Sequence, residues 1–288
     1  MIPYFNGHLF DLPPFLGGVP IHMFGVLVAL GVIIGDRIVV MQGRRRGLDP
    51  HDAKYMNARI VIGGFIVAHL VSVIFYYPER ILEDWRVLFN PFAGLSSFGG
   101  FLGAFLAFLY FTKKADIPRL AYADSVALGL SVGWIFGRTG CFTAHDHPGR
   151  HTSFFLAVRY PEGARHDLGF YELLFTIAMT AILFAYNRKP RPPGRIIALA
   201  ALMYAPVRFA LDFLRATDVT RPDERYLGLT PAQWACLATA ALGVHLWRRR
   251  EPPSAPPPSP TDAPTDAPTG APTDAPPAPP ERPSAYEA

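Results

Sequence analysis

Charged side chains that stand inside long apolar stretches predict an anion-binding site in this chain. Arg208 and Asp212 are four residues apart, so on a helix they share one face, and Arg215 follows Asp212 at a spacing of three. Arg138 and Glu172 lie in or beside two other apolar stretches. A charge at membrane depth costs at least about 2.5 to 3.5 kcal/mol and normally faces a partner or a cavity. Because guanidinium groups stay charged and offer paired donors to phosphate oxygens, we expect these residues to bind an anionic phospholipid head group.

Seven apolar stretches must position these residues. They run over Pro20 to Met41, Arg59 to Tyr77, Leu95 to Phe111, Leu120 to Phe136, Leu168 to Tyr186, Ile196 to Leu214 and Pro231 to Trp247. Each approaches or exceeds the roughly 17 to 25 residues that cross the hydrocarbon core as a helix. Half of the residues are hydrophobic, and the core of one soluble domain could not bury seven such helices. The sequence therefore predicts an all-α, polytopic integral membrane protein with seven transmembrane helices.

The distribution of basic residues predicts the orientation. The loops after the first, third, fifth and seventh stretches are rich in lysine and arginine, as in Arg44 to Arg46 and Arg248 to Arg250, whereas the other loops mix both signs. Basic loops stay on the cytoplasmic side, so we expect the N terminus outside and the C terminus in the cytoplasm. The formal net charge of +4 follows from this topology and gives no reason to expect nucleic-acid binding.

The apolar stretches and the basic loops also predict the domain organisation. We expect residues 1–19 to form a periplasmic N-terminal segment, and residues 20–250 to form the seven-helix domain, with a periplasmic insertion near 142–166. No basic leading region or cleavage pattern precedes the first stretch, so we expect a retained helix and not a signal peptide. Residues 251–288 repeat Pro, Ala and Thr, which predicts a disordered cytoplasmic tail.

With this orientation, polar groups from five helices gather in one layer near the outer face. The simpler interpretation of Asp212 is that it forms ion pairs with the arginines of the sixth helix and only stabilises that helix. For Gly99 and Gly103, close helix packing competes with an approach of the backbone to the head group. The two cysteines, Cys141 and Cys236, are too few for a disulfide framework.

Three histidines and an aspartate stand close together in the sequence. His145, Asp146, His147 and His151 could suggest a metal site, but they lack the spacing and the ligand set of recognised zinc patterns. We therefore expect no metal and no cofactor.

A family resemblance adds to this interpretation. Gly137-Arg138-Thr139-Gly140-Cys141-Phe142-Thr143-Ala144-His145-Asp146 with Gly149 resembles the signature Gly-Arg-x-Gly-Asn-Phe-x-Asn-x-Glu-x-x-Gly of bacterial prolipoprotein diacylglyceryl transferases. Four further segments match in order: His22 to Gly25, Ser97 to Gly100, His166 to Glu172, and Tyr204 to Arg215. The resemblance covers about residues 20 to 247.

The resemblance implies a bacterial inner-membrane enzyme with its active site toward the periplasm. Such an enzyme transfers diacylglyceryl from phosphatidylglycerol to the lipobox cysteine thiol of prolipoproteins and forms a thioether. The implied partners are phosphatidylglycerol, prolipoprotein signal peptides and the lipid bilayer, and we expect a monomer. The implied catalytic residues are Arg138, Arg208, His166 and Glu172. The implied substrate-binding residues are His22, Ser97, Gly99, Gly100, Cys141, Asp146, Tyr204, Asp212 and Arg215.

Three departures from the family pattern affect the chemistry. Phe98 stands where the family often has a histidine that is proposed as the base, and Phe98 cannot move a proton. Cys141 replaces the first signature Asn, while Ala144 and Asp146 replace the later Asn and Glu. Either His166 or His22 then serves as base, or the arginines alone favour the thiolate.

Two other functions compete. A divergent paralogue would bind anionic lipid or modify another acceptor. A transporter of anionic solutes would be expected to have a midplane site and repeat-related broken helices, whereas the polar layer here is displaced outward and no internal repeat is found.

Overall fold

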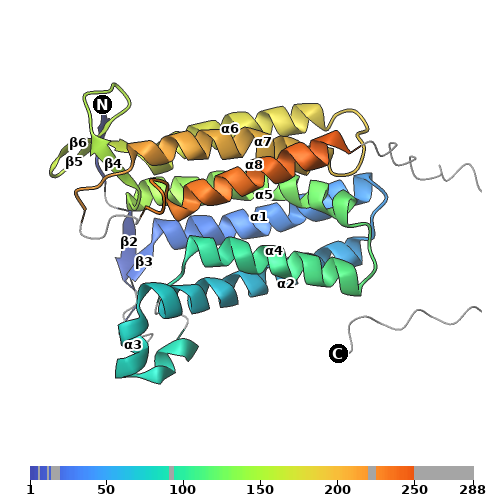
Figure 1. The fold of residues 1–288 in the computed structure, drawn as a ribbon, viewed down its shortest axis with the longest axis horizontal. Coiled ribbons are helices and arrows are strands. Elements are labelled where there is room, and N and C mark those ends of the chain that lie inside the picture. The colour runs from blue at the N-terminus through green and yellow to red at the C-terminus, as the bar shows by residue number, and fades with distance from the viewer. Residues whose placement is uncertain (6, 12, 14–19, 91–93, 220–224, 250–288) are drawn as a thin grey trace, which may run out of the picture.

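A computed structural model describes residues 1–5, 7–11, 13, 20–90, 94–219 and 225–249. The expected tail at 251–288 lies outside these residues. A long helix stands at each of the seven apolar stretches (Figure 1): α1 (Met23–Arg45), α2 (Pro50–Val71), α4 (Ser97–Lys114), α5 (Arg119–Ala144), α6 (Leu168–Tyr186), α7 (Arg195–Leu211) and α8 (Pro231–Arg248). A π-helical turn, η2 (Ser72–Tyr76), extends α2, and a 3₁₀ turn, η4 (Asp212–Leu214), follows α7. The short α3 (Pro78–Glu83) and η3 (Trp85–Phe89) connect α2 to α4.

Five of these helical segments are long and apolar enough to cross a membrane. They are α1, α2 with η2, α5, α6, and α7 with η4. Large apolar side chains on α2 and α4 face outward, including Ile62 and Phe105, which are 58% and 50% exposed. A surface of this kind is suited to lipid and not to water. The helices α4 and α8 have 18 residues each and end in basic turns, and they are not among these five.

Two helices are longer than the sequence predicts. The apolar pattern placed the start of the second helix at Arg59, but α2 begins at Pro50, because the Asp49 carboxylate caps it and proline suits the first turn. The fourth was expected to end at Phe136, yet α5 continues to Ala144. The hydroxyls of Thr139 and Thr143 donate to carbonyls one turn back, which satisfies these polar side chains inside the helix.

Small residues let the helices pack closely. In the α1–α5 contact, a Cβ on Gly129 would lie 2.5 Å from the Gly35 carbonyl oxygen. In the α2–α4 contact, a Cβ on Gly103 would lie 2.3 Å from the Gly63 carbonyl oxygen. Larger residues would force these backbones apart, so the glycines fix the spacing within both pairs.

The N terminus of α7 is held by a buried carboxylate from α5. Asp124 accepts hydrogen bonds of 2.9 to 3.0 Å from the backbone N–H groups of Gly194, Ile196 and Ile197. A negative charge at this position satisfies the unpaired donors of the first helical turn and complements the helix dipole. This contact fixes α7 against α5 at the end of the bundle opposite the strands (Figure 1).

The all-α expectation needs a correction, because strands cover one end of the bundle. The strands β1 (Ile2–Pro3), β5 (Val158–Tyr160), β6 (Gly163–Asp167) and β4 (Pro148–His151) form one sheet in that order. The strands β2 (His8–Asp11) and β3 (Pro20–His22) form a second pair. The pairing of β1 with β5 is parallel, and the other pairings are antiparallel. Strands of two to five residues are too short to show an alternating pattern, so the sequence did not reveal them.

The four-stranded sheet is tied to the segment that follows α7. Arg165 on β6 donates to both oxygens of Asp218 at 2.9 and 2.6 Å. These bonds hold the pKa of Asp218 at about 2, below the usual range of an aspartate. The backbone N–H of Ala216 also donates to the Pro148 carbonyl at 3.2 Å. The sheet therefore helps to position the C-terminal end of α7.

Candidate active site

One buried glutamate joins two arginines at the end of the bundle that carries the strands. Glu172 on α6 is 1% exposed. One of its oxygens lies 2.8 Å from Arg138 Nε on α5, and the other lies 3.1 Å from Arg208 Nε on α7. A carboxylate between two guanidinium groups holds three helices together and orients both arginines.

Tyr204 completes this contact from α7. Its hydroxyl donates to Glu172 at 3.2 Å and accepts from Arg138 Nη2 at 3.5 Å. Trp134 lies one turn before Arg138, and its ring centroid is 4.5 Å from the guanidinium carbon. Arg138 is thus held in place by an acid, a hydroxyl and an aromatic face.

A second carboxylate extends the network toward α8. Asp212 is fully buried in η4 and lies 2.7 Å from Arg208 Nη1, the partner that the spacing of four predicts. Arg215 Nη1 lies 3.6 Å from the same oxygen. The other oxygen accepts a hydrogen bond from Thr230, which also caps α8. Asp212 therefore connects α7 to the start of α8.

The ion pairs of the cluster involve three arginines. Among the described residues that form it, Arg138, Arg208 and Arg215 face two carboxylates, Glu172 and Asp212.

Asp167 fixes the two helices that carry Arg138 and Glu172. Its carboxylate caps α6 by accepting from Phe170 N at 2.9 Å, and it also accepts from the Tyr160 hydroxyl at 2.9 Å. His145, which ends α5 in a left-handed conformation, lies 2.9 Å from the same carboxylate through Nδ1. Burial and the charge of Asp167 raise the pKa of Tyr160, so this hydroxyl stays protonated and donates.

Sequence reasoning did not identify Asp167 and Thr230 as part of this arrangement. Asp167 precedes the apolar run that begins at Leu168, which is a helix N-cap signal. Thr230 followed by Gln233 is a capping-box pattern, and the structure contains that box. Both signals predict caps, but neither predicts a contact with residues from other helices.

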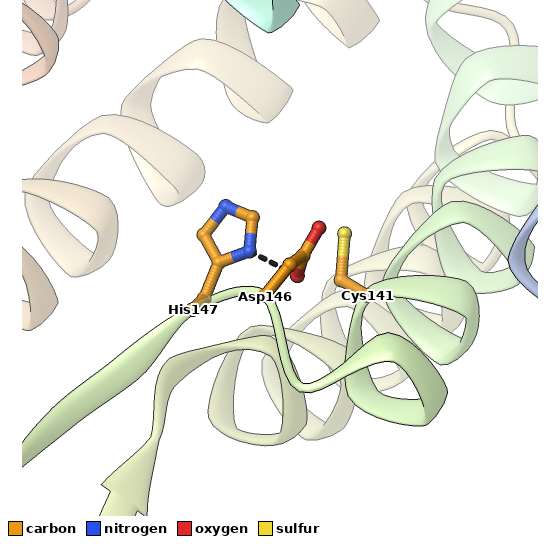
Figure 2. Close-up of side chains that lie close together, drawn as sticks. All are labelled: Cys141, Asp146 and His147. Atoms are coloured by element: carbon orange, nitrogen blue, oxygen red, sulfur yellow. Dashed lines mark hydrogen bonds and ion pairs between the residues drawn. The ribbon is translucent and has the colours of Figure 1, made fainter. Parts of the chain in front are cut away.

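The last turn of α5 brings Cys141 beside the residues that follow the helix (Figure 2). Arg138 Nη1 lies 3.7 Å from Cys141 Sγ. The ligand atoms of Cys141, Asp146 and His147 all lie within 4.8 Å of one another, and His147 Nδ1 is hydrogen-bonded to Asp146. Both cysteines of the chain are free. Cys141 and Asp146, two predicted substrate-binding residues, therefore lie together next to Arg138.

His166 lies on β6, and the hydrogen bond described for it is with Tyr171. The distance from His166 Nδ1 to the Tyr171 hydroxyl is 2.9 Å. Burial lowers the pKa of His166 below the ordinary value of a histidine, so the imidazole is neutral and can accept a proton near neutral pH. No described contact joins it directly to Arg138 or Glu172, and its role as a base stays a prediction.

The other predicted substrate-binding residues lie outside the ion-pair cluster. His22 ends β3, and its ring centroid is 5.6 Å from that of His8. Ser97 opens α4, and its neighbour Phe98 is 50% exposed. Gly99 packs on α2, where a Cβ would lie 2.7 Å from the Val67 carbonyl oxygen, whereas a Cβ on Gly100 would make only ordinary contacts. Gly99 thus has a packing role, while lipid contact by these residues stays a prediction.

The cluster has the properties of a phosphate clamp. Glu172 contacts the Nε atom of each arginine. The Nη groups of Arg138 make long contacts with Tyr204 and Cys141, at 3.5 and 3.7 Å. These donors can exchange such contacts for shorter, charge-assisted bonds to phosphate oxygens. The buried setting strengthens such bonds, because water competes poorly there.

Comparison with known proteins identifies the family of this chain. The family model of prolipoprotein diacylglyceryl transferase matches residues 13–249. Proteins named phosphatidylglycerol–prolipoprotein diacylglyceryl transferase are similar to the chain. The one from Polynucleobacter asymbioticus is 32% identical over 81% of this chain and 93% of its own length. Those from Chromohalobacter salexigens and Bordetella bronchiseptica are 30% and 29% identical, each over 82% of this chain and over 91% and 94% of their own lengths. The chain belongs to the prolipoprotein diacylglyceryl transferase family.

Proposed function

We propose that this chain transfers the diacylglyceryl group of phosphatidylglycerol to the lipobox cysteine thiol of prolipoproteins. The observation that carries the proposal is the buried pair of guanidinium groups, Arg138 and Arg208, held by Glu172. The names of the similar proteins support the substrates. The product is a thioether, and glycerol phosphate leaves.

The first task of the site is to bind and neutralise the phosphate. Arg138 and Arg208 come from different helices and meet at Glu172, so a phosphate between their Nη groups would contact both. In the reaction the carbon–oxygen bond to the phosphate breaks, and negative charge develops on the leaving group. Donors already oriented by Glu172 and Tyr204 stabilise this charge without further rearrangement.

The second task is to generate the nucleophile. The acceptor thiol loses its proton, the sulfur bonds to the glyceryl carbon, and the electron pair of the broken bond leaves with the phosphate. Phe98 cannot take the proton, so we assign the role of base to His166, whose neutral imidazole can accept the proton. His22 is the alternative base, and thiolate formation assisted only by the arginines is another.

The membrane arrangement is also part of the proposal. All seven long helices would cross the bacterial inner membrane, including α4 and α8. The basic loops would lie in the cytoplasm, which places the strands and the cluster on the periplasmic side. An open apolar hollow of about 410 Å³ lies along α7, lined by Pro206, Val207, Ala210, Leu211 and Leu214. An acyl chain of the lipid could lie there while its head group reaches the arginines.

Complementation tests the function. The chain should restore growth to a bacterium depleted of its own transferase, and the purified protein should move labelled diacylglyceryl from phosphatidylglycerol to a lipobox peptide. Arg138→Lys and Arg208→Lys keep the charge but lose the planar paired donors, so each should lower transfer by about 100- to 1,000-fold. Arg248→Lys, at an exposed position at the end of α8, is the matched control and should leave transfer unchanged.

One outcome would contradict the phosphate-binding role of the arginines, and another would contradict the transfer reaction. Near-normal transfer by both arginine variants would make these residues structural. Binding of phosphatidylglycerol without transfer to any lipobox peptide would instead favour a divergent paralogue that binds anionic lipid.

A further inference from the structure

Three side chains with different metal-binding atoms meet where α5 ends. The chain reverses direction at His145, which has a φ of 50°. This reversal returns Asp146 and His147 to the side of Cys141, one turn back in the helix (Figure 2). A thiol sulfur, a carboxylate oxygen and an imidazole nitrogen then lie within 4.8 Å of one another.

The arrangement differs from the histidine-rich pattern that the sequence suggested. His145 is held by Asp167, and His151 lies 3.5 Å from Asp218. Neither histidine belongs to the group. Its sulfur atom comes from Cys141, which is not part of the histidine-rich pattern. The group shares only Asp146 and His147 with the four residues from which no metal is expected in the sequence.

The donor set fits a zinc-class cation. Zinc accepts sulfur, nitrogen and oxygen ligands at about 2.0 to 2.3 Å, and catalytic zinc sites use three protein ligands with a fourth position open. Tetrahedral donors at these lengths stand roughly 3.3 to 3.8 Å apart. The His147 and Asp146 atoms are already in contact, so the group would rearrange by about 1 Å around an ion. Cys141 and His147 are partly buried, and Asp146 is exposed, which leaves access for an ion.

We propose that Cys141, Asp146 and His147 bind one zinc-class divalent cation beside the phosphate clamp. The position follows from the turn after α5, which brings Asp146 and His147 to Cys141. Arg138 Nη1 is 3.7 Å from Cys141 Sγ, so the ion would lie next to the residue assigned to the phosphate.

The open position of this ion suits the acceptor thiol, a step that rests on the proposed function. The thiol would replace a bound water, give its proton to His166, the base assigned in the proposed function, and bind as a thiolate. Its sulfur would then bond to the glyceryl carbon as the carbon–oxygen bond to phosphate breaks. This route generates the nucleophile without a base at Phe98.

Cobalt binding tests the site independently of transfer. The full chain, purified in detergent and stripped with a chelator, should bind one equivalent of Co²⁺ with a sulfur-to-metal charge-transfer band, and Zn²⁺ should displace it. Cys141→Ser should abolish the band, while Cys236→Ser, which changes the other cysteine, should keep it. Asp146→Asn and His147→Ala should each weaken Co²⁺ binding at least about tenfold. A thermal melt of each variant confirms that it is folded.

The opposite results overturn the proposal. No charge-transfer band in the wild type, or a band that survives Cys141→Ser, would leave Asp146 and His147 as a hydrogen-bonded pair near a packed cysteine. A lipobox peptide should strengthen the band, and the same peptide with Ser for Cys should not. An equal response to both peptides refutes thiol binding at the ion. A protein that binds Co²⁺ as described but transfers no lipid would refute the proposed function and not the metal site.

Discussion

Replacing Glu172 with glutamine tests whether the buried carboxylate holds the site together. The change keeps the size of the side chain but removes the negative charge that lies 2.8 Å from Arg138 Nε and 3.1 Å from Arg208 Nε. Glutamine offers one acceptor oxygen and points an amide donor at the other guanidinium. Removal of one partner from a buried ion pair typically costs about 3 to 5 kcal/mol, because an uncompensated charge remains. Glu172 is 1% exposed, so water cannot screen the remaining charges.

The expected loss can be measured as a thermal melt of the protein in detergent. At about 2 to 4 °C per kcal/mol, the midpoint should fall by roughly 6 to 20 °C. Glu162→Gln is the matched control, because Glu162 is exposed, and the midpoint should then move by less than about 2 °C. Transfer activity should also fall in the Glu172 variant at temperatures where it remains folded, since the two arginines lose their common orienting group.

A double substitution separates the charge argument from a loss of packing. Glu172→Gln combined with Arg208→Gln removes one charge of each sign, so it should destabilise by less than the sum of the two single changes. A midpoint within about 2 °C of the wild type for Glu172→Gln alone would refute the reasoning. Strict additivity in the double variant would also refute it, since the two residues would then act independently.

Three further predictions follow from the same geometry. Because burial lowers the pKa of His166, the wild type should keep its transfer rate down to a pH below the ordinary histidine value of about 6.5 and lose it on further acidification. The variant His166→Gln should be slow near neutral pH and recover as rising pH ionises the thiol. A deficit that is equal at every pH would make His166 structural. Cysteine introduced at the exposed Arg159 should react with a membrane-impermeant reagent added to intact cells, and cysteine at the exposed Lys113 should not. The reverse labelling would place the cluster on the cytoplasmic side. Asp167→Asn should destabilise the protein by about 1 to 3 kcal/mol in a detergent melt and lower transfer, because it weakens the α6 cap and the bonds to His145 and Tyr160. An unchanged melt would show that these contacts contribute little to stability.

The sequence by itself determined where the long helices stand and which residues need partners. Length and apolarity predict membrane helices because a lipid-exposed backbone must satisfy its own hydrogen bonds, and five of the helices meet that description in the structure. The pair of Arg208 and Asp212 was predictable because a spacing of four places both on one helix face, and they lie 2.7 Å apart. The family signature around Arg138 is likewise a local pattern, and the family model confirms the resemblance.

Only the tertiary structure decided which distant residues meet. Glu172 joins Arg138 and Arg208 because the start of α6 packs beside the C-terminal parts of α5 and α7, and no local pattern encodes that packing. Asp124 caps α7 some 70 residues later in the chain for the same reason. The group of Cys141, Asp146 and His147 depends on the left-handed turn at His145 and on the extension of α5 past its apolar stretch. Hydrophobic periodicity reports burial along one element, whereas these contacts depend on how separate elements pack.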